Sequence, residues 1–194
     1  MNTMLIFGSV LLFGLVGLIA YLVSVYNTLV RLSNNINKAW SNIDVMLKQR
    51  HDELPKLVEV CNSYIAHERD TLEAITQARN AYAKTTSIDE KTKAENRITG
   101  ALGRLFAVAE NYPDLKANQE FLHVQQRISA VESTIADRRE FYNDSVNLYN
   151  IRIAQIPDVF VANQMNYRAR PLLEVPQAEK QDVSLAFANR PRKA

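Results

Sequence analysis

The chain opens on a long stretch without charge. Residues 4–25 carry no Asp, Glu, Lys or Arg and consist mainly of Leu, Ile, Val, Phe and Gly. At helical rise such a stretch is roughly 33 Å long, which matches the hydrocarbon core of a bilayer. The pattern therefore predicts a transmembrane helix with Met4 and Val25 at its ends.

A cleaved signal peptide is the alternative for this segment. Signal peptides carry a basic N-terminal region, a shorter apolar core and a small-residue cleavage site. Residues 1–4 contain no Lys or Arg, the apolar run is long, and residues 21–26 offer no good cleavage site. The single cysteine, Cys61, lies too far downstream for a lipoprotein anchor. We therefore expect the span to be retained.

Apolar residues continue beyond the span at intervals of mostly three and four, which predicts that the helix does not end at the membrane. No Pro or Gly occurs between the span and Pro55, so the first helix is expected to run from about Met4 to Arg50. Pro55 then either kinks this helix or lies in the first turn of a second one, with Asp52 as N-cap. The periodic positions are Tyr26, Val30, Ile36, Trp40, Ile43 and Leu47.

The same periodicity predicts three more helices, over about residues 54–84, 87–110 and 117–156. Residues 111–114 form a predicted turn. The apolar residues 159–161, which follow Pro157, are expected to fold back onto the bundle or to begin a short helix.

Two local signals refine the third helix. Ser87 and Glu90 have the spacing of a capping box, with Ser87 as N-cap. Gly100 and Gly103 are weak helix formers, so we expect them to permit the close approach of a neighbouring helix.

Together these elements predict an all-α protein, in which an N-terminal transmembrane helix continues into an elongated antiparallel bundle of about four long helices. We expect an anchor over residues 1–25, a bundle over 26–163 and a basic, Pro-containing tail over 164–194. The tail is expected to be irregular, with one helical piece near 178–188. It is either a disordered tail or a segment that contacts anionic lipid or a neighbouring subunit.

Charge adds an orientation to this picture. The N-terminal flank of the span has no Lys or Arg, whereas Arg31, Lys38, Lys48 and Arg50 follow it. The positive-inside rule then places the bundle in the cytoplasm and the N-terminus outside. The net charge of +2 is nearly balanced, so we expect no nucleic-acid partner.

The sequence nominates no catalytic residue, metal ligand or cofactor site. His67 and Glu68 lack the second histidine of a zinc helix motif, so they are interpreted as a polar surface pair. Cys61 falls on an apolar helix face and is interpreted as a buried, inert thiol. Asp44 is spaced to pair with Lys48 on the same helix, and its carboxylate is interpreted as part of a solvated or inter-helix ion pair rather than as an acid–base group. Tyr142 and Tyr149 are interpreted as core, and Arg138 with Arg139 as a charged face.

One polar pattern asks for an explanation. Polar residues recur every seven positions along the helix that leaves the membrane, although Asn is a mediocre helix former. The pattern is either a solvated face or a polar stripe between subunits, where Asn fixes the register of packed helices. The proposed stripe consists of Asn27, Asn34, Asn35, Ser41 and Asn42.

Several motifs between about residues 26 and 157 closely resemble those of the LemA family. The resemblance implies an N-terminal membrane anchor and an antiparallel helical bundle in a bacterial membrane, with no established enzyme activity or cofactor. After Pro157 the chain departs from the family pattern, and residues 168–171 are unlike it. The residues that carry the resemblance include Trp40, Asp44, Lys48, Arg50, Pro55, Tyr112, Pro113, Tyr142 and Asn143.

These observations favour a non-enzymatic, single-pass protein of the bacterial inner membrane that associates with itself, contacts lipid and forms a scaffold. A flexible tether would have used Gly, Ser or Pro between span and body. The alternative is an adaptor or regulator of a membrane enzyme such as a membrane metalloprotease. An exposed apolar groove would favour the adaptor, and a pocket with converging carboxylates or histidines would favour a hydrolase.

Overall fold

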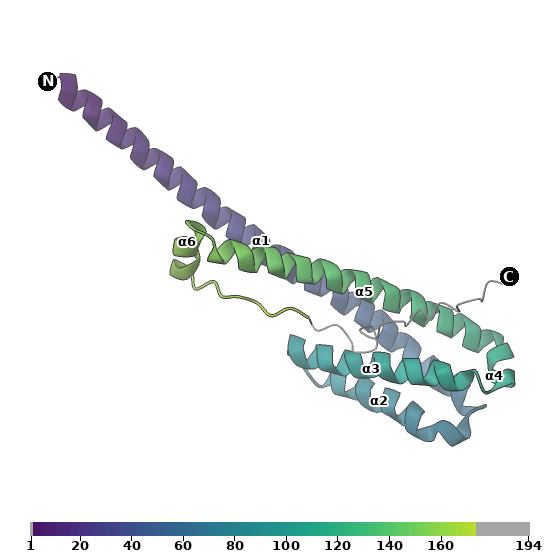
Figure 1. Ribbon diagram of the computed structural model, residues 1–194. Helices are drawn as coiled ribbons and strands as arrows, with labels where there is room; N and C mark the ends of the chain where they lie inside the picture. Colours follow the sequence, from purple (N-terminus) through teal and green to yellow (C-terminus); the bar gives the residue numbers. More distant parts are fainter. Residues whose placement is uncertain (1, 174–194) are drawn as a thin grey trace, which may run out of the picture.

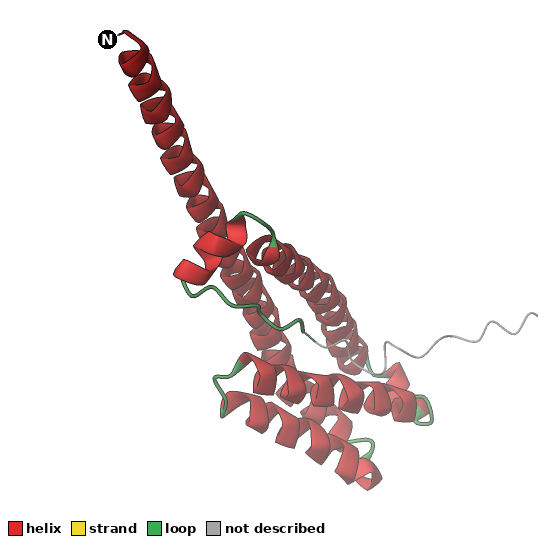
Figure 2. Ribbon diagram, turned by 60° about the vertical axis from the view of Figure 1, so that its left-hand side comes forward, coloured by secondary structure: helices red, strands yellow, loops and turns green. Residues whose placement is uncertain are grey.

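The computed structural model describes residues 2–173, which contain six α-helices, one short 3-10 helix and no β-strand. The predicted all-α fold is confirmed. A long helix projects from the body at its N-terminal end, and a second long helix returns antiparallel beside its other half, while a helical hairpin packs at the far end (Figures 1 and 2). The elements are α1 (Asn2–Asn62), η1 (Ala66–Glu68), α2 (Arg69–Ala83), α3 (Ile88–Ala109), α4 (Pro113–Ala117), α5 (Gln119–Ala154) and α6 (Asp158–Gln164).

Helix α1 joins the apolar N-terminal segment to the bundle without a break. Residues 3–24 are exposed throughout, and Val25 is the first buried side chain. The uncovered part of α1 is long and apolar enough to cross a membrane. Contacts with the rest of the fold therefore begin at the residue where the sequence predicts the span to end.

Pro55 lies inside α1 and does not begin a new helix, so the predicted helix over 54–84 is wrong in its first part. Proline has no N–H to bond to the carbonyl four residues earlier, which here belongs to His51. The Arg79 side chain of α2 supplies a substitute, because its Nε donates to the His51 carbonyl oxygen at 3.3 Å. A long-range contact thus satisfies the carbonyl that Pro55 leaves unpaired.

The helix ends after α2 differ from the sequence prediction in detail. Ser87 occupies the N-cap of α3, but its side chain makes no capping hydrogen bond, so the predicted capping box is wrong. Glu90 instead accepts a hydrogen bond from the Thr85 hydroxyl. The predicted turn around Pro113 is the short helix α4. Asn118 then caps α5, accepting a hydrogen bond from the Phe121 N–H at 2.9 Å.

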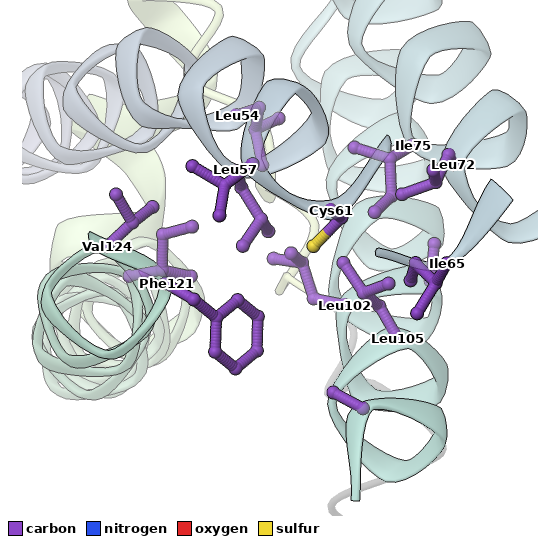
Figure 3. Close-up of a cluster of buried hydrophobic side chains, with 14 of the residues drawn as sticks. Leu54, Leu57, Cys61, Ile65, Leu72, Ile75, Leu102, Leu105, Phe121 and Val124 are labelled. Atoms are coloured by element: carbon purple, nitrogen blue, oxygen red, sulfur yellow. The ribbon is translucent and has the colours of Figure 1, made fainter. Parts of the chain in front are cut away.

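The apolar side chains form two large clusters and one small one. The first fills the space between the end of α1, α2, α3 and the start of α5; it includes Cys61, whose side chain points in among leucines (Figure 3). The second lies along the α1–α5 interface and contains Tyr142 and Tyr149, which confirms their prediction as core. The third joins Val25 of α1 to Ala162 of α6. Residues 159–161 lie in α6, which packs back onto the bundle as expected.

Gly100 and Gly103 contradict the expectation of a close helix approach. Both lie on the exposed side of α3, and a Cβ added at either position meets no atom within 4 Å. Their small size therefore serves no packing role within the described chain.

Replacing Gly100 or Gly103 with alanine is expected to raise the free energy of unfolding by about 0.5–1 kcal/mol at each site, because glycine is the poorer helix former and the site has room for Cβ. Thermal unfolding of the full chain in detergent, followed by circular dichroism, measures the change. A loss of stability would show that these surfaces are covered in the assembled protein.

Candidate functional site

A cluster of charged side chains lies buried where α1, α3 and α5 meet. Its centre is Arg50, which is fully buried although it carries a guanidinium group. Arg50 Nη2 forms an ion pair with Glu95 of α3, which is also fully buried, and Nη1 pairs with Glu132 of α5. Nη1 also donates to the Thr99 hydroxyl at 3.0 Å. One cation on α1 thus binds acceptors on two other helices.

His51, the next residue of α1, extends this cluster toward α2. Its Nε2 lies 2.6 Å from the second carboxylate oxygen of Glu95, and its ring centroid lies 4.3 Å from that of Tyr82. Burial, together with the nearby cations Arg50 and Arg79, lowers the pKa of His51 to about 4. His51 is therefore neutral at pH 7, and its Nε2–H donates to Glu95.

Asp44 forms a second polar contact one to two turns earlier on α1. Its Oδ1 accepts hydrogen bonds from Tyr82 of α2 at 2.7 Å and from Lys91 of α3 at 2.8 Å. The hydrogen bond from Lys91 lowers the pKa of Asp44. The expected pair with Lys48 on the same helix is wrong, since Lys48 is exposed, whereas the inter-helix ion pair is confirmed by the contact with Lys91.

This arrangement serves to fix the helices relative to one another. Arg50 and Glu95 are inaccessible to solvent, so they present no surface on which a substrate can react. Among the described residues, no group of three or more His, Cys, Asp or Glu side chains is placed to hold a metal ion. His67 is exposed on η1, and burial raises the pKa of Cys61 to about 12, as expected for an inert thiol.

A second feature is an extended segment, residues 167–173, that runs back along α5. Two asparagines of α5 lie two helical turns apart, and each binds both the backbone N–H and the backbone carbonyl of one residue in this segment. Asn143 accepts from the Leu173 N–H at 2.8 Å and donates to its carbonyl at 3.1 Å. Asn150 does the same for Arg170, at 2.9 and 2.8 Å. We call this segment the strap.

The strap also connects α5 to α1. The Arg170 guanidinium donates to Asn37 Oδ1 at 2.8 Å and to Ser33 Oγ at 3.0 Å, both on α1. The same group lies 5.6 Å from the ring centroid of Tyr149 on α5. The strap therefore covers part of the α1–α5 seam. The tail is irregular here, as predicted, and its expected helical piece near 178–188 lies outside the described residues.

The polar stripe lies on the outer surface of α1. At 3.6 residues per turn, Asn27, Asn34 and Ser41 fall on the side opposite the buried Ile36 and Ile43. These three residues and Asn35 are exposed, while Asn42 is partly buried. The stripe is thus available for contact with another molecule, and its role in assembly stays a prediction.

Most of the residues that carry the family resemblance make contacts between helices. Trp40 of α1 packs edge-on against Tyr142 of α5, with ring centroids 6.2 Å apart. Tyr112 packs against the first apolar cluster, and Pro113 begins α4. Asp44, Arg50 and Asn143 make the polar contacts described above, and Pro55 leaves the carbonyl that Arg79 binds.

Comparison with known proteins agrees with this architecture. The model of the LemA family matches residues 39–187, so the match continues past Pro157, where we expected the resemblance to end. Protein LemA of Metamycoplasma hominis is 31% identical over 162 residues, which cover 81% of this chain and 72% of that protein.

Magnetosome proteins MamQ 1 and MamQ 2 of Paramagnetospirillum magneticum are each 27% identical over 173 residues. The matched region covers 76% of this chain but only 64% of either magnetosome protein, so the chain spans less than two thirds of their length. None of these names states an enzymatic activity. With the family model matching most of its length, this chain belongs to the LemA family.

Proposed function

We propose that this protein is a non-enzymatic scaffold of the bacterial inner membrane, which associates with itself through the part of α1 next to the bilayer. The observation that carries the proposal is the continuity of α1, which joins an uncovered apolar segment to the bundle as one 61-residue helix. A helix transmits orientation, whereas a flexible linker does not. Every bundle is thus joined to its span without a flexible joint, as ordered lateral packing of identical copies requires.

Exposed charges support a cytoplasmic bundle. The cations Arg31, Lys38 and Lys48 follow the span on exposed positions of α1, and the described residues before the span carry no Lys or Arg. Under the positive-inside rule, this asymmetry favours a body on the cytoplasmic side.

The polar stripe supplies the proposed contact between copies. Asn side chains between packed helices fix their register, because an amide without a partner in such an interface is costly. The stripe lies on the outer side of α1, while the opposite side packs on α5. Neighbouring copies can therefore contact one another along α1 without disturbing the bundle.

Replacing Asn34 and Asn42 together with alanine is expected to change the size of the particles extracted in mild detergent. Size-exclusion chromatography with light scattering, followed by electron microscopy of single particles, measures the assembly. Asn147→Ala, on the exposed side of α5, is the matched control and leaves particle size unchanged. Closed rings or larger shells of the unmodified chain support the scaffold. Uniform monomers would contradict it and favour an adaptor for a membrane enzyme.

A further inference from the structure

Helix α6 lies at the point where α1 leaves the bundle. Ala162 of α6 is buried against Val25 and Leu29 of α1. In both views α6 and the turn before it form the part of the bundle nearest to the projecting N-terminal half of α1 (Figures 1 and 2). The helix therefore sits beside the end of the proposed transmembrane span.

The polarity of this region is inverted relative to an ordinary protein surface. The acidic residue of α6, Asp158, is only 2% exposed and pairs with Arg152 of α5. Phe160, two residues later, is 68% exposed, and Ile156 in the preceding turn is 80% exposed. A surface that turns its carboxylate inward and its phenyl ring outward is suited to an apolar surrounding rather than to water.

We propose that α6 and the turn before it enter the interface of the lipid bilayer beside the span, with Phe160 and Ile156 inserted among the lipids. The inference rests on the membrane anchoring in the proposed function and adds a second lipid contact. Proximity to the apolar surface of residues 3–24 favours lipid over a protein partner, since α6 packs on α1 at Val25 and Leu29, directly after that segment. Exposed Arg168, which follows α6, is available to the phosphates of anionic lipids.

This second contact has a structural consequence. A single span leaves a bundle free to rotate about the span axis and to tilt with it. Insertion of α6 on one side of α1 sets the direction in which the molecule tilts, because α6 leaves the interface when the molecule tilts the other way. The inserted α6 thus restricts the tilt of the bundle, so that neighbouring stripes meet at one inclination to the membrane.

Fluorescence quenching by lipid tests the proposal in the full chain. Trp40, the only tryptophan, is replaced by phenylalanine, and Phe160→Trp places a single reporter on α6. The variant is reconstituted into phosphatidylcholine–phosphatidylglycerol vesicles that contain lipids brominated near the headgroup end of the acyl chain. We expect about two-fold quenching or more, as for a side chain ~5–10 Å deep in the boundary between headgroups and chains.

Two further single-tryptophan variants in the same background serve as controls. Phe141→Trp replaces an exposed phenylalanine of α5 more than three turns before α6, and we expect no quenching by brominated lipid. Leu15→Trp lies at the middle of the span and reports on insertion itself, in parallel vesicles whose lipids are brominated deep in the acyl chain. Quenching at residue 160 but not at 141 supports the proposal.

Three results would overturn it. In the first, the residue-160 reporter is quenched by aqueous iodide and not by bromine, while Leu15→Trp is quenched by bromine. In that case α6 lies in water, so the transmembrane anchor is supported and the contact of α6 with lipid is not. If the residue-160 reporter is shielded from both quenchers, a protein surface covers α6 instead of lipid. If Leu15→Trp is not quenched by bromine, the anchoring and the α6 contact fail together.

Discussion

Replacing Arg50 with methionine is expected to lower the free energy of unfolding by about 3–5 kcal/mol. Methionine fills a similar volume but leaves Glu95 without its cation in a fully buried site. A buried carboxylate that loses its partner keeps the full cost of its removal from water. The loss is therefore far larger than that of a surface ion pair, which contributes about 0–1 kcal/mol.

Unfolding of the full chain in detergent, by urea with circular dichroism, measures this loss. Lys48→Met is the matched control, since it removes an exposed cation from the same helix two residues earlier, and its effect is expected to stay within about 0.5 kcal/mol. Adding Glu95→Gln to Arg50→Met removes the stranded charge and keeps an acceptor for His51. The double variant should recover part of the stability, and an Arg50→Met protein as stable as the unmodified chain would contradict this account.

The long elements follow from sequence because their apolar spacing is regular. The helical period continues without interruption from the span to Leu47, and it repeats from Phe121 to Tyr149 on α5. The pattern therefore predicts one buried face on each helix, and the structure shows that Ile36 to Leu47 of α1 pack against Val131 to Tyr149 of α5. The start of α3 after Ser87 is equally well marked by turn residues and acidic residues.

The departures from the sequence prediction have two different origins. Pro55 normally disrupts a helix, yet α1 continues because Arg79, from a separate helix, binds the carbonyl left open at His51. Gly100 and Gly103 fall opposite the apolar positions Ile98, Leu102 and Leu105 at 3.6 residues per turn, and the structure has both exposed. The helical period therefore contained the outward position of the glycines, whereas no local pattern contains the contact of Arg79.

The buried cluster escaped prediction for a related reason. Glu95 follows Ala94 in the apolar face of α3, where a charged residue ordinarily marks the solvent side. The burial of Glu95 depends on its ion pair with Arg50 of α1, which lies 45 positions earlier in the sequence. The sequence offered one signal for this cluster: the carboxylate of Glu95 stands at a position that the helical pattern of α3 turns inward. The pairing of Asn143 and Asn150 with the strap gave no comparable signal, since an extended backbone can bind any exposed amide.

The cluster and the strap act on the same helix and thereby support the proposed scaffold. Arg50, His51 and Asp44 connect the far half of α1 to the α2–α3 hairpin and α5. Arg170 connects the nearer half of α1 to the strap at Ser33 and Asn37. Together these contacts fix the rotation of α1 within the bundle, and with it the direction in which the outer stripe faces. A stripe held in one direction is a requirement for ordered lateral assembly.

Acidification is expected to destabilise the fold through His51. The pKa of His51 is about 4 in the folded chain, below its ordinary value of 6.5, so between these values the unfolded chain binds more protons than the folded one. Neutral His51 therefore makes its full contribution to the free energy of unfolding above pH 6.5. This contribution is lost progressively as the pH falls toward 4. The gap between the two pKa values corresponds to on the order of 3 kcal/mol.

His51→Gln separates this effect from the titration of other groups. Glutamine retains an N–H donor for Glu95 but does not titrate, so the free energy of unfolding should depend much less on pH between 6.5 and 4. The groups around His51 are Arg50, Asp44 and Asp52 on α1, Arg79 and Tyr82 on α2 and Glu95 on α3, and all of them remain in this variant. His67→Gln, on the exposed η1, is the control and should keep the slope of the unmodified chain. Parallel curves for the unmodified chain and His51→Gln would show that His51 is already charged in the fold, because a salt bridge to Glu95 would then outweigh burial.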